Sequence, residues 1–219
     1  MTNILSIYPR QQDLRTQTNE DWTDGFPLYR AGLAGVVPGA KNVGNGALTI
    51  IAVDPLTPLG GYEVEVTSVG GLTAITVTDP YGTIAARGFA GAPIYASGLT
   101  LNLAVGSTAF AVGDAFAVQP TVDFIDDTGI RYVLQVRRTQ DAASVMFQAD
   151  SAPPDGSLPT MVAGNGTGRP ALLVPYDLMD ARRFPVGEYV YDLLAVADGR
   201  RRVVYYGNLS HVQGAGYIP

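Results

Sequence analysis

The sequence has no cysteine, one lysine (Lys41), one histidine (His211) and four glutamates among its 219 residues. The missing cysteine excludes disulfides, thiolate nucleophiles and thiolate metal sites. A single imidazole without any thiol also argues against zinc and other transition metals. We therefore expect no metal and no cofactor. Assembly in the cytoplasm agrees with a chain that needs no disulfides.

Long apolar runs and concentrated positive charge are also missing. No uninterrupted apolar stretch approaches the roughly 18 residues that a membrane helix needs, and the N-terminal segment MTNILSIYPRQQDLRTQTNEDW is too polar for a signal peptide. The formal net charge is −6, whereas a phosphate-binding surface needs clustered Lys and Arg. We expect neither a membrane nor a nucleic acid as partner.

What the chain does contain favours β-structure. Hydrophobic residues make up 47%, and Gly (26) and Pro (15) are frequent. The charged fraction of 16% and the apolar content exclude a disordered chain. Because Lys and Glu are scarce, the residues that build helices are under-represented. The length fits one large domain or two small ones, and we predict an all-β protein.

Charge divides the chain into three regions. Residues 1–30 are polar, and residues 31–120 carry only seven charged side chains but fifteen glycines. Residues 121–219 return to twenty charged side chains. A shift of this size predicts two folding units and an arm.

The middle region alternates with a period of two residues, as half-buried strands do. About six short strands at this spacing predict a small sandwich or barrel. The expected strands are 48–53, 62–67, 75–77, 99–103 and a final hairpin joining 110–112 to 116–118 through Gly113-Asp114.

The last region alternates in the same way. Asp198-Gly199 is a strong hairpin signal, and one helical turn is expected around Asp177–Arg183, stopped by Pro185. Strands without crossover helices predict an antiparallel Ig-like sandwich. The expected strands are 132–137, 143–149, 171–174, 189–194 and 203–206.

Candidate catalytic groups are few. His211 could complete a Ser-His-Asp triad only with a nucleophile elbow, which the sequence lacks, and we interpret it as a polar residue near the chain end. The carboxylates that could serve glycoside hydrolysis stand at turns or on a wet strand face; they are Asp79, Asp126-Asp127, Asp198, Glu63 and Glu65. We expect no enzyme and no catalytic, cofactor-binding or metal-binding residues.

Three other features are candidate binding sites. Gly164–Gly168 lacks the Lys-Ser/Thr of a phosphate loop and is interpreted as a flexible loop. Arg200–Arg202 could meet an acidic partner. Four tyrosines could form an aromatic platform, but packing across strands is the simpler explanation: Tyr189, Tyr191, Tyr205 and Tyr206.

Residues 42–120 resemble a small β module of tailed-phage virion proteins. The resemblance rests on Gly44–Thr49, Gly61–Val64, Val77–Gly82 and Thr108–Phe116. That module recurs in phage head decoration proteins and in Mu-type tail sheath proteins. The resemblance implies a place on the surface of a virion.

Residues 121–219 resemble the Ig-like domain of phage baseplate and tail-fibre attachment proteins. The matching segments are Tyr132–Arg137, Phe184–Leu193, Asp198-Gly199 and Gly207. Such domains open with a short strand, which Asn19–Phe26 would supply. The middle module would then be inserted into the second domain, giving residues 1–18 as an extended arm, 19–30 plus 121–219 as the Ig-like sandwich, and 31–120 as the insertion.

These resemblances imply a non-enzymatic structural protein of a tailed phage, assembled in the bacterial cytoplasm and carried in the virion. We favour the tail, baseplate or fibre-attachment region; the alternatives are a head decoration protein and a receptor- or carbohydrate-binding module. Family domains usually continue into a fibre, so a chain ending at Pro219 favours a capping or decorating role. Expected partners are capsid, tail or baseplate subunits. We also expect the chain to form a homo-oligomer (trimer or hexamer). An extended arm of this length could reach roughly 60 Å across a neighbour.

Overall fold

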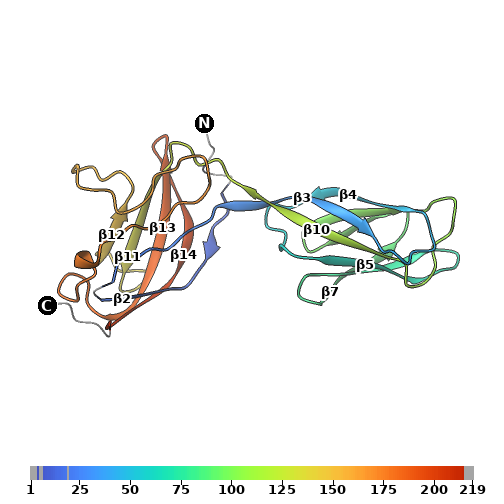
Figure 1. Cartoon of the computed structure of the whole chain (residues 1–219), viewed down its shortest axis with the longest axis horizontal. Coiled ribbons are helices and arrows are strands. Elements are labelled where there is room, and N and C mark those ends of the chain that lie inside the picture. The colour runs from blue at the N-terminus through green and yellow to red at the C-terminus, as the bar shows by residue number, and fades with distance from the viewer. Residues whose placement is uncertain (1–3, 5–6, 19, 215–219) are drawn as a thin grey trace. The chain divides into compact units, whose positions relative to one another are not determined.

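The computed structural model describes residues 4, 7–18 and 20–214, and it confirms the all-β expectation (Figure 1). Within 7–18 and 20–214, helical structure is confined to η2, a single 3-10 turn at Tyr176–Leu178. No helix in the described ranges could cross a bilayer. The chain forms two compact units: a terminal unit made of Met1–Tyr29 and Phe124–Pro219, and an inserted unit made of Arg30–Asp123.

The terminal unit is built on one sheet with the strand order β1-β14-β13-β11-β12, and β2 also pairs with β14. Its apolar side chains point inward from alternate positions and pack on the bridged segments around Trp22 and Leu172. The strands are β1 (Arg10–Gln11), β2 (Leu14–Gln17), β11 (Arg131–Arg137), β12 (Phe147–Asp150), β13 (Gly187–Ala197) and β14 (Arg200–Val212).

The described residues of the N-terminal segment belong to the terminal unit, unlike the separate extended arm that the sequence suggested. Strands β1 and β2 pair in parallel with β14, and Ile7 and Leu14 are buried in the core of the terminal unit. Without this pairing β14 would present an open edge with unsatisfied backbone groups. The otherwise antiparallel sheet therefore has a parallel border. Residues 1–3 and 5–6 of the expected arm lie outside the described part of the chain, as does the end at Pro219.

The chain enters the terminal unit before the insertion and returns to it afterwards. Trp22 bridges Val174, and Gly25 bridges Ala171, both in antiparallel sense. The segment that opens the unit thus pairs with a segment that follows the insertion. Asn19, the first residue of the expected opening strand, is outside the described residues.

The inserted unit contains two sheets, with orders β3-β10-β5-β6-β7 and β4-β9-β8, and its own hydrophobic core. Strand β5 shows the pattern clearly, because Tyr62, Val64 and Val66 are buried while its glutamates are exposed. The strands are β3 (Tyr29–Pro38), β4 (Ala47–Val53), β5 (Tyr62–Ser68), β6 (Ala74–Thr78), β7 (Ile84–Phe89), β8 (Pro93–Ala96), β9 (Leu99–Ala104) and β10 (Ala115–Phe124).

Several sequence-based boundaries are wrong. The expected strand 110–112 is a loop, and Phe110 instead packs edge-on against Phe116 at 6.1 Å between ring centroids. Strand β12 begins at Phe147 rather than Ala143, because residues 139–145 form turns and bends. Residues 171–174 make isolated bridges only.

Candidate functional site

The terminal unit has a groove of about 740 Å³ beside β12. Its rim is the loop that follows β12, where the side chain of Leu158 is 88% exposed. The lining is rich in proline, which has no backbone N–H and holds extended or turn conformations. The residues that line it are Gln148, Asp150, Pro153, Pro154, Asp155, Ser157, Leu158, Pro159, Thr160, Pro175, Asp177 and Leu178.

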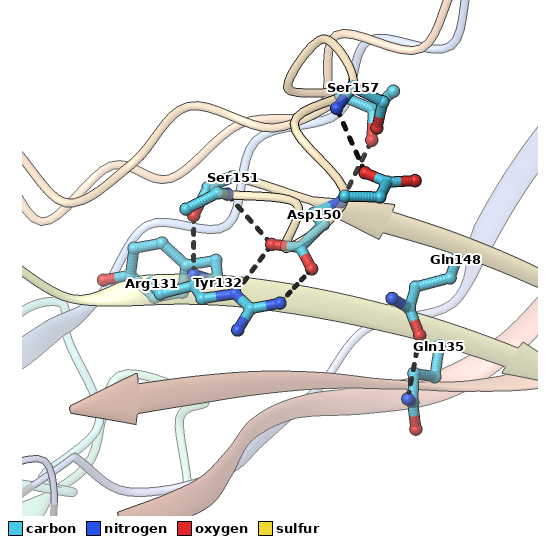
Figure 2. Close-up of polar contacts among 10 residues, drawn as sticks. Arg131, Tyr132, Gln135, Gln148, Asp150, Ser151 and Ser157 are labelled. Carbon is cyan, nitrogen blue, oxygen red and sulfur yellow. Dashed lines mark hydrogen bonds and ion pairs between the residues drawn. The ribbon is translucent and has the colours of Figure 1, made fainter. Parts of the chain in front are cut away.

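Asp150, which lines this groove, forms a bidentate ion pair with Arg131 (Figure 2). Arg131 on β11 donates from Nε to Asp150 Oδ1 at 2.9 Å and from Nη2 to Oδ2 at 2.5 Å. Burial raises the pKa of Asp150, but Arg131 and the backbone N–H of Ala152 outweigh it and leave the pKa below its usual range. The Asp150 carboxylate is therefore held ionised, with both oxygens hydrogen-bonded. It has no proton to donate, so it is unsuitable as a general acid.

The polar groups around this pair bond to one another. Ser151 Oγ accepts from the N–H of Tyr132 at 2.8 Å, and Thr160 Oγ1 accepts from the N–H of Asp150 at 2.9 Å. Gln135 donates to Gln148 across β11 and β12 (Figure 2). These contacts fasten the loop to the sheet. Within the described ranges, no three His, Cys, Asp or Glu side chains gather as a metal site would require.

His211 is a core residue and not the polar chain-end residue that the sequence suggested. It is 1% exposed on β14, and its ring stacks on Phe184 with 4.5 Å between centroids. Neither ring nitrogen has a hydrogen-bond partner among the described residues. Burial lowers the pKa of His211, and the backbone of Phe184 offsets this only in part. The neutral ring thus serves as an aromatic packing element.

The glycine loop 164–168 is occupied by the protein's own carboxylate. Asp127 Oδ1 accepts from the N–H of Gly166 at 2.8 Å and of Gly168 at 3.0 Å. Its Oδ2 accepts from the Tyr132 hydroxyl at 3.0 Å. The amides that could cradle an anion are therefore used internally, and the loop is fixed where the sequence suggested flexibility.

The other candidate carboxylates behave mostly as turn residues. Asp79 Oδ1 accepts from the backbone of Tyr81 and Thr83, and Asp126 accepts from Thr128. Asp198 adopts a positive φ of 50° in the hairpin turn before Gly199. The turn interpretation is confirmed for these three residues, while Asp127 is a buried clamp instead.

The tyrosine platform is wrong for three of its four members. Tyr189, Tyr191 and Tyr205 are buried in the core, and each hydroxyl donates to a backbone carbonyl of its own unit. Tyr206 alone is exposed, at 43%. The cross-strand packing alternative is therefore the correct one.

The basic cluster Arg200–Arg202 begins β14 at the hairpin. Arg200 and Arg201 are exposed and Arg202 is half-buried. Arg202 lies opposite the core residue Ala195, and its Nε is buried without a hydrogen-bond partner among the described residues. Arg200 and Arg201 remain available to an acidic partner.

Sequence reasoning missed the carboxylate that organises the inserted unit. Asp114, 2% exposed, accepts from the N–H groups of Val43, Gly44 and Ala111 at 2.8–3.0 Å. These bonds, with that of Val43 strongest, lower the pKa of Asp114. Two of the quoted motifs, around Gly44 and Gly113, are thus joined by one side chain. The Gly-Asp turn was the only local signal.

The surface of the inserted unit is apolar and poor in charge. It carries most of the exposed large hydrophobic side chains of the described residues, whereas residues 31–120 hold only seven charges. Where such side chains lie next to one another, they mark contacts with other macromolecules. The exposed apolar residues are Leu33, Val37, Val43, Ile51, Leu56, Val69, Leu72, Tyr81, Ile84, Phe89, Tyr95, Val105, Val112 and Val122.

Comparison with known proteins gives little. No family model and no curated protein matches the chain. Among solved structures, FlgL from Xanthomonas campestris matches in two crystal forms, at 23% and 22% identity and TM-scores of 0.32 and 0.33, over 46% and 44% of this chain. The flagellar hook junction protein FlgK from Burkholderia pseudomallei matches at 14% identity and TM-score 0.34 over 68% of this chain. The chain spans 32–39% of the length of these structures, and likenesses this distant carry no functional argument.

Proposed function

We propose that this protein is a non-enzymatic structural component on the outside of a tailed-phage particle, in the tail, baseplate or fibre-attachment region. The observation that carries the proposal is the exposed apolar, charge-poor surface of the inserted unit. A particle protein works by repeated surface contact, and such a surface suits that role. The motif resemblances of residues 42–120 and 121–219 supply the kind of particle.

Internal bonding of the polar groups supports a structural role. The carboxylates with the best-defined surroundings, Asp114, Asp127 and Asp150, each accept two or more hydrogen bonds from the protein itself. Groups used in this way stabilise loops and strands. A binding surface on rigid β units is the activity that this arrangement supports best.

Quantitative mass spectrometry of purified particles tests the proposal, with the major capsid protein as internal standard. We expect a copy number that is a small multiple of three or six, as tail and baseplate rings require. A copy number in the hundreds would place the protein on the head instead of the tail and favour a decoration protein. Absence from the particles would overturn the proposal.

A further inference from the structure

The outer face of β5, β6 and β7 in the inserted unit forms a shallow hollow of about 620 Å³. Its floor consists of Ala74, Thr76 and Thr78 on β6, which are half-buried. One wall is β5 and the other is β7, the last strand of its sheet. The hollow lies entirely within one unit and involves none of the groups described as clamps.

The strand register places opposite charges on the two walls. Glu65 pairs with Thr76, and Thr76 pairs with Arg87, so the three residues form one row across the sheet. Neighbouring strands lie about 4.8 Å apart, which puts the Cα atoms of Glu65 and Arg87 about 10 Å from each other. The two side chains do not meet in the structure, since no salt bridge of either residue is found among the described residues.

Apolar side chains flank the basic residue on the β7 wall. Ile84 and Phe89 are 49% and 48% exposed on the same face as Arg87. Phe89 pairs with Ala74, and Ile84 pairs with Thr78. The β5 wall instead carries a second carboxylate, Glu63, beside Glu65. The face is therefore acidic on one side, basic and apolar on the other.

We propose that this face binds the same face of a second copy of the chain around a two-fold axis parallel to β6. Such an axis, passing above Thr76, exchanges the two walls. It places Arg87 of each copy over Glu65 of the other copy. Two equivalent ion pairs then form across the contact. Two-fold contacts of one self-complementary patch are the commonest form of homo-oligomer. Because the acidic wall of one copy faces the basic wall of the other, the face is complementary in charge to itself. A second copy of the chain is therefore the partner that fits it.

The contact is small, because three short strands provide it. Interfaces below the standard size are weak, so we expect dissociation in the micromolar range or weaker. Many copies held on one particle would add such contacts together. The inference extends the proposed function, but it does not depend on a phage particle, and it can fail while the particle assay succeeds.

Sedimentation of the full chain over a wide concentration series tests the inference. We expect a monomer–dimer equilibrium that weakens with salt. Either charge reversal, Arg87→Glu or Glu65→Arg, should weaken association at least about tenfold by opposing like charges. The double variant, Arg87→Glu with Glu65→Arg, should restore it to within about threefold.

Matched controls separate this face from general charge and apolar effects. Lys41→Glu makes the same charge change as Arg87→Glu at an exposed turn of the same unit, and it should leave association unchanged. Phe89→Ser should weaken the dimer, whereas Ile51→Ser, on the other sheet, should not. A wild-type monomer at millimolar concentration, or failure of the double reversal to rescue with unchanged circular dichroism, would overturn the inference.

Discussion

The terminal and inserted units fix their loops in the same way but differ in the character of their surfaces. Each has a buried aspartate that accepts several hydrogen bonds and holds a loop distant in the sequence: Asp127 in the terminal unit and Asp114 in the inserted unit. Among the described residues, the terminal unit pairs some of its charges, as in Arg131–Asp150 and Arg137–Asp192, and the inserted unit pairs Arg30 with Asp123. The inserted unit leaves Glu65 and Arg87 apart among apolar side chains. The cores are therefore alike in how loops are fixed, while the surfaces are suited to different work.

Removing the clamp of the terminal unit should have the largest effect. Asp127→Ala leaves two backbone N–H groups and the Tyr132 hydroxyl without their acceptor, and we expect a loss of about 3–5 kcal/mol. Urea unfolding followed by the fluorescence of Trp22, the only tryptophan and a core residue of this unit, measures it.

The neighbouring variant Asp126→Ala is the control and should cost clearly less, because its contacts are at an exposed turn. Hydrogen exchange of the inserted unit should not change. If both units lose protection together in Asp127→Ala, the two cores are not independent.

A close approach in the inserted unit should give the next largest effect. A Cβ at Gly46 would meet the ring of Phe110 and the carbonyl oxygen of Ala104. We expect Gly46→Ala to cost about 1–3 kcal/mol through overpacking, measured by hydrogen exchange of β4 and β9. Gly35→Ala, which meets nothing within 4 Å, should be tolerated. Equal effects of the two variants would refute this packing argument.

Breaking the groove's ion pair should have a smaller effect. Arg131→Ala leaves the buried carboxylate of Asp150 with the N–H of Ala152 but without its guanidinium. We expect a loss of about 1–2 kcal/mol, since water screens the partly exposed arginine. Arg131→Lys keeps the charge without the two-point geometry and should lose less. Trp22 fluorescence again reports the transition, and an unchanged midpoint in Arg131→Ala would contradict the role given to this pair.

Mild acid should give the smallest effect, by lowering the stability of the terminal unit without lowering that of the inserted unit. The pKa of His211 is lower when folded, so the unfolded chain binds the proton more readily below pH 6.5. Stability of the terminal unit is therefore complete above pH 6.5 and falls as the pH drops below it. The inserted unit has no histidine; the Asp114 contribution is lost only as the pH falls below 3.8.

Unfolding monitored at pH 7 and pH 5 checks this difference. His211→Phe keeps a ring against Phe184 and should remove the pH dependence of the terminal unit over that interval. Persistence of the same dependence in this variant would assign it to other groups.

Local alternation was enough to predict the all-β class and several strands. Strands β5 and β9 have regular alternation of buried and exposed residues, and their observed bounds lie within one residue of the expected ones. Strand β3 was missed because Gly32 and Gly35 interrupt its pattern. The hairpin at 110–118 failed because Phe110 is buried by contact with Phe116 and not by strand periodicity.

The groups that fix the loops could not be found from local patterns. Asp127 bonds to residues 39 and 41 positions later, and Asp114 reaches back 70 and 71 positions. A sequence window that shows a turn aspartate gives no sign of such partners. The row formed by Glu65, Thr76 and Arg87 likewise depends on register across three strands. The burial of Tyr191 and Tyr205 depends on the N-terminal segment, whose short strands carry too little pattern to predict.

The parallel pairing of β2 with β14 has a mechanical consequence. Leu14 lies opposite Leu209, and Gln17 lies opposite Val212. Tension between the start of β2 and the end of β14 pulls these strands along their length in opposite directions. Their hydrogen bonds then share the load in shear and do not open one at a time like a zipper. Residues 30–123, inserted between the two parts of the terminal unit, carry no tension until that unit gives way.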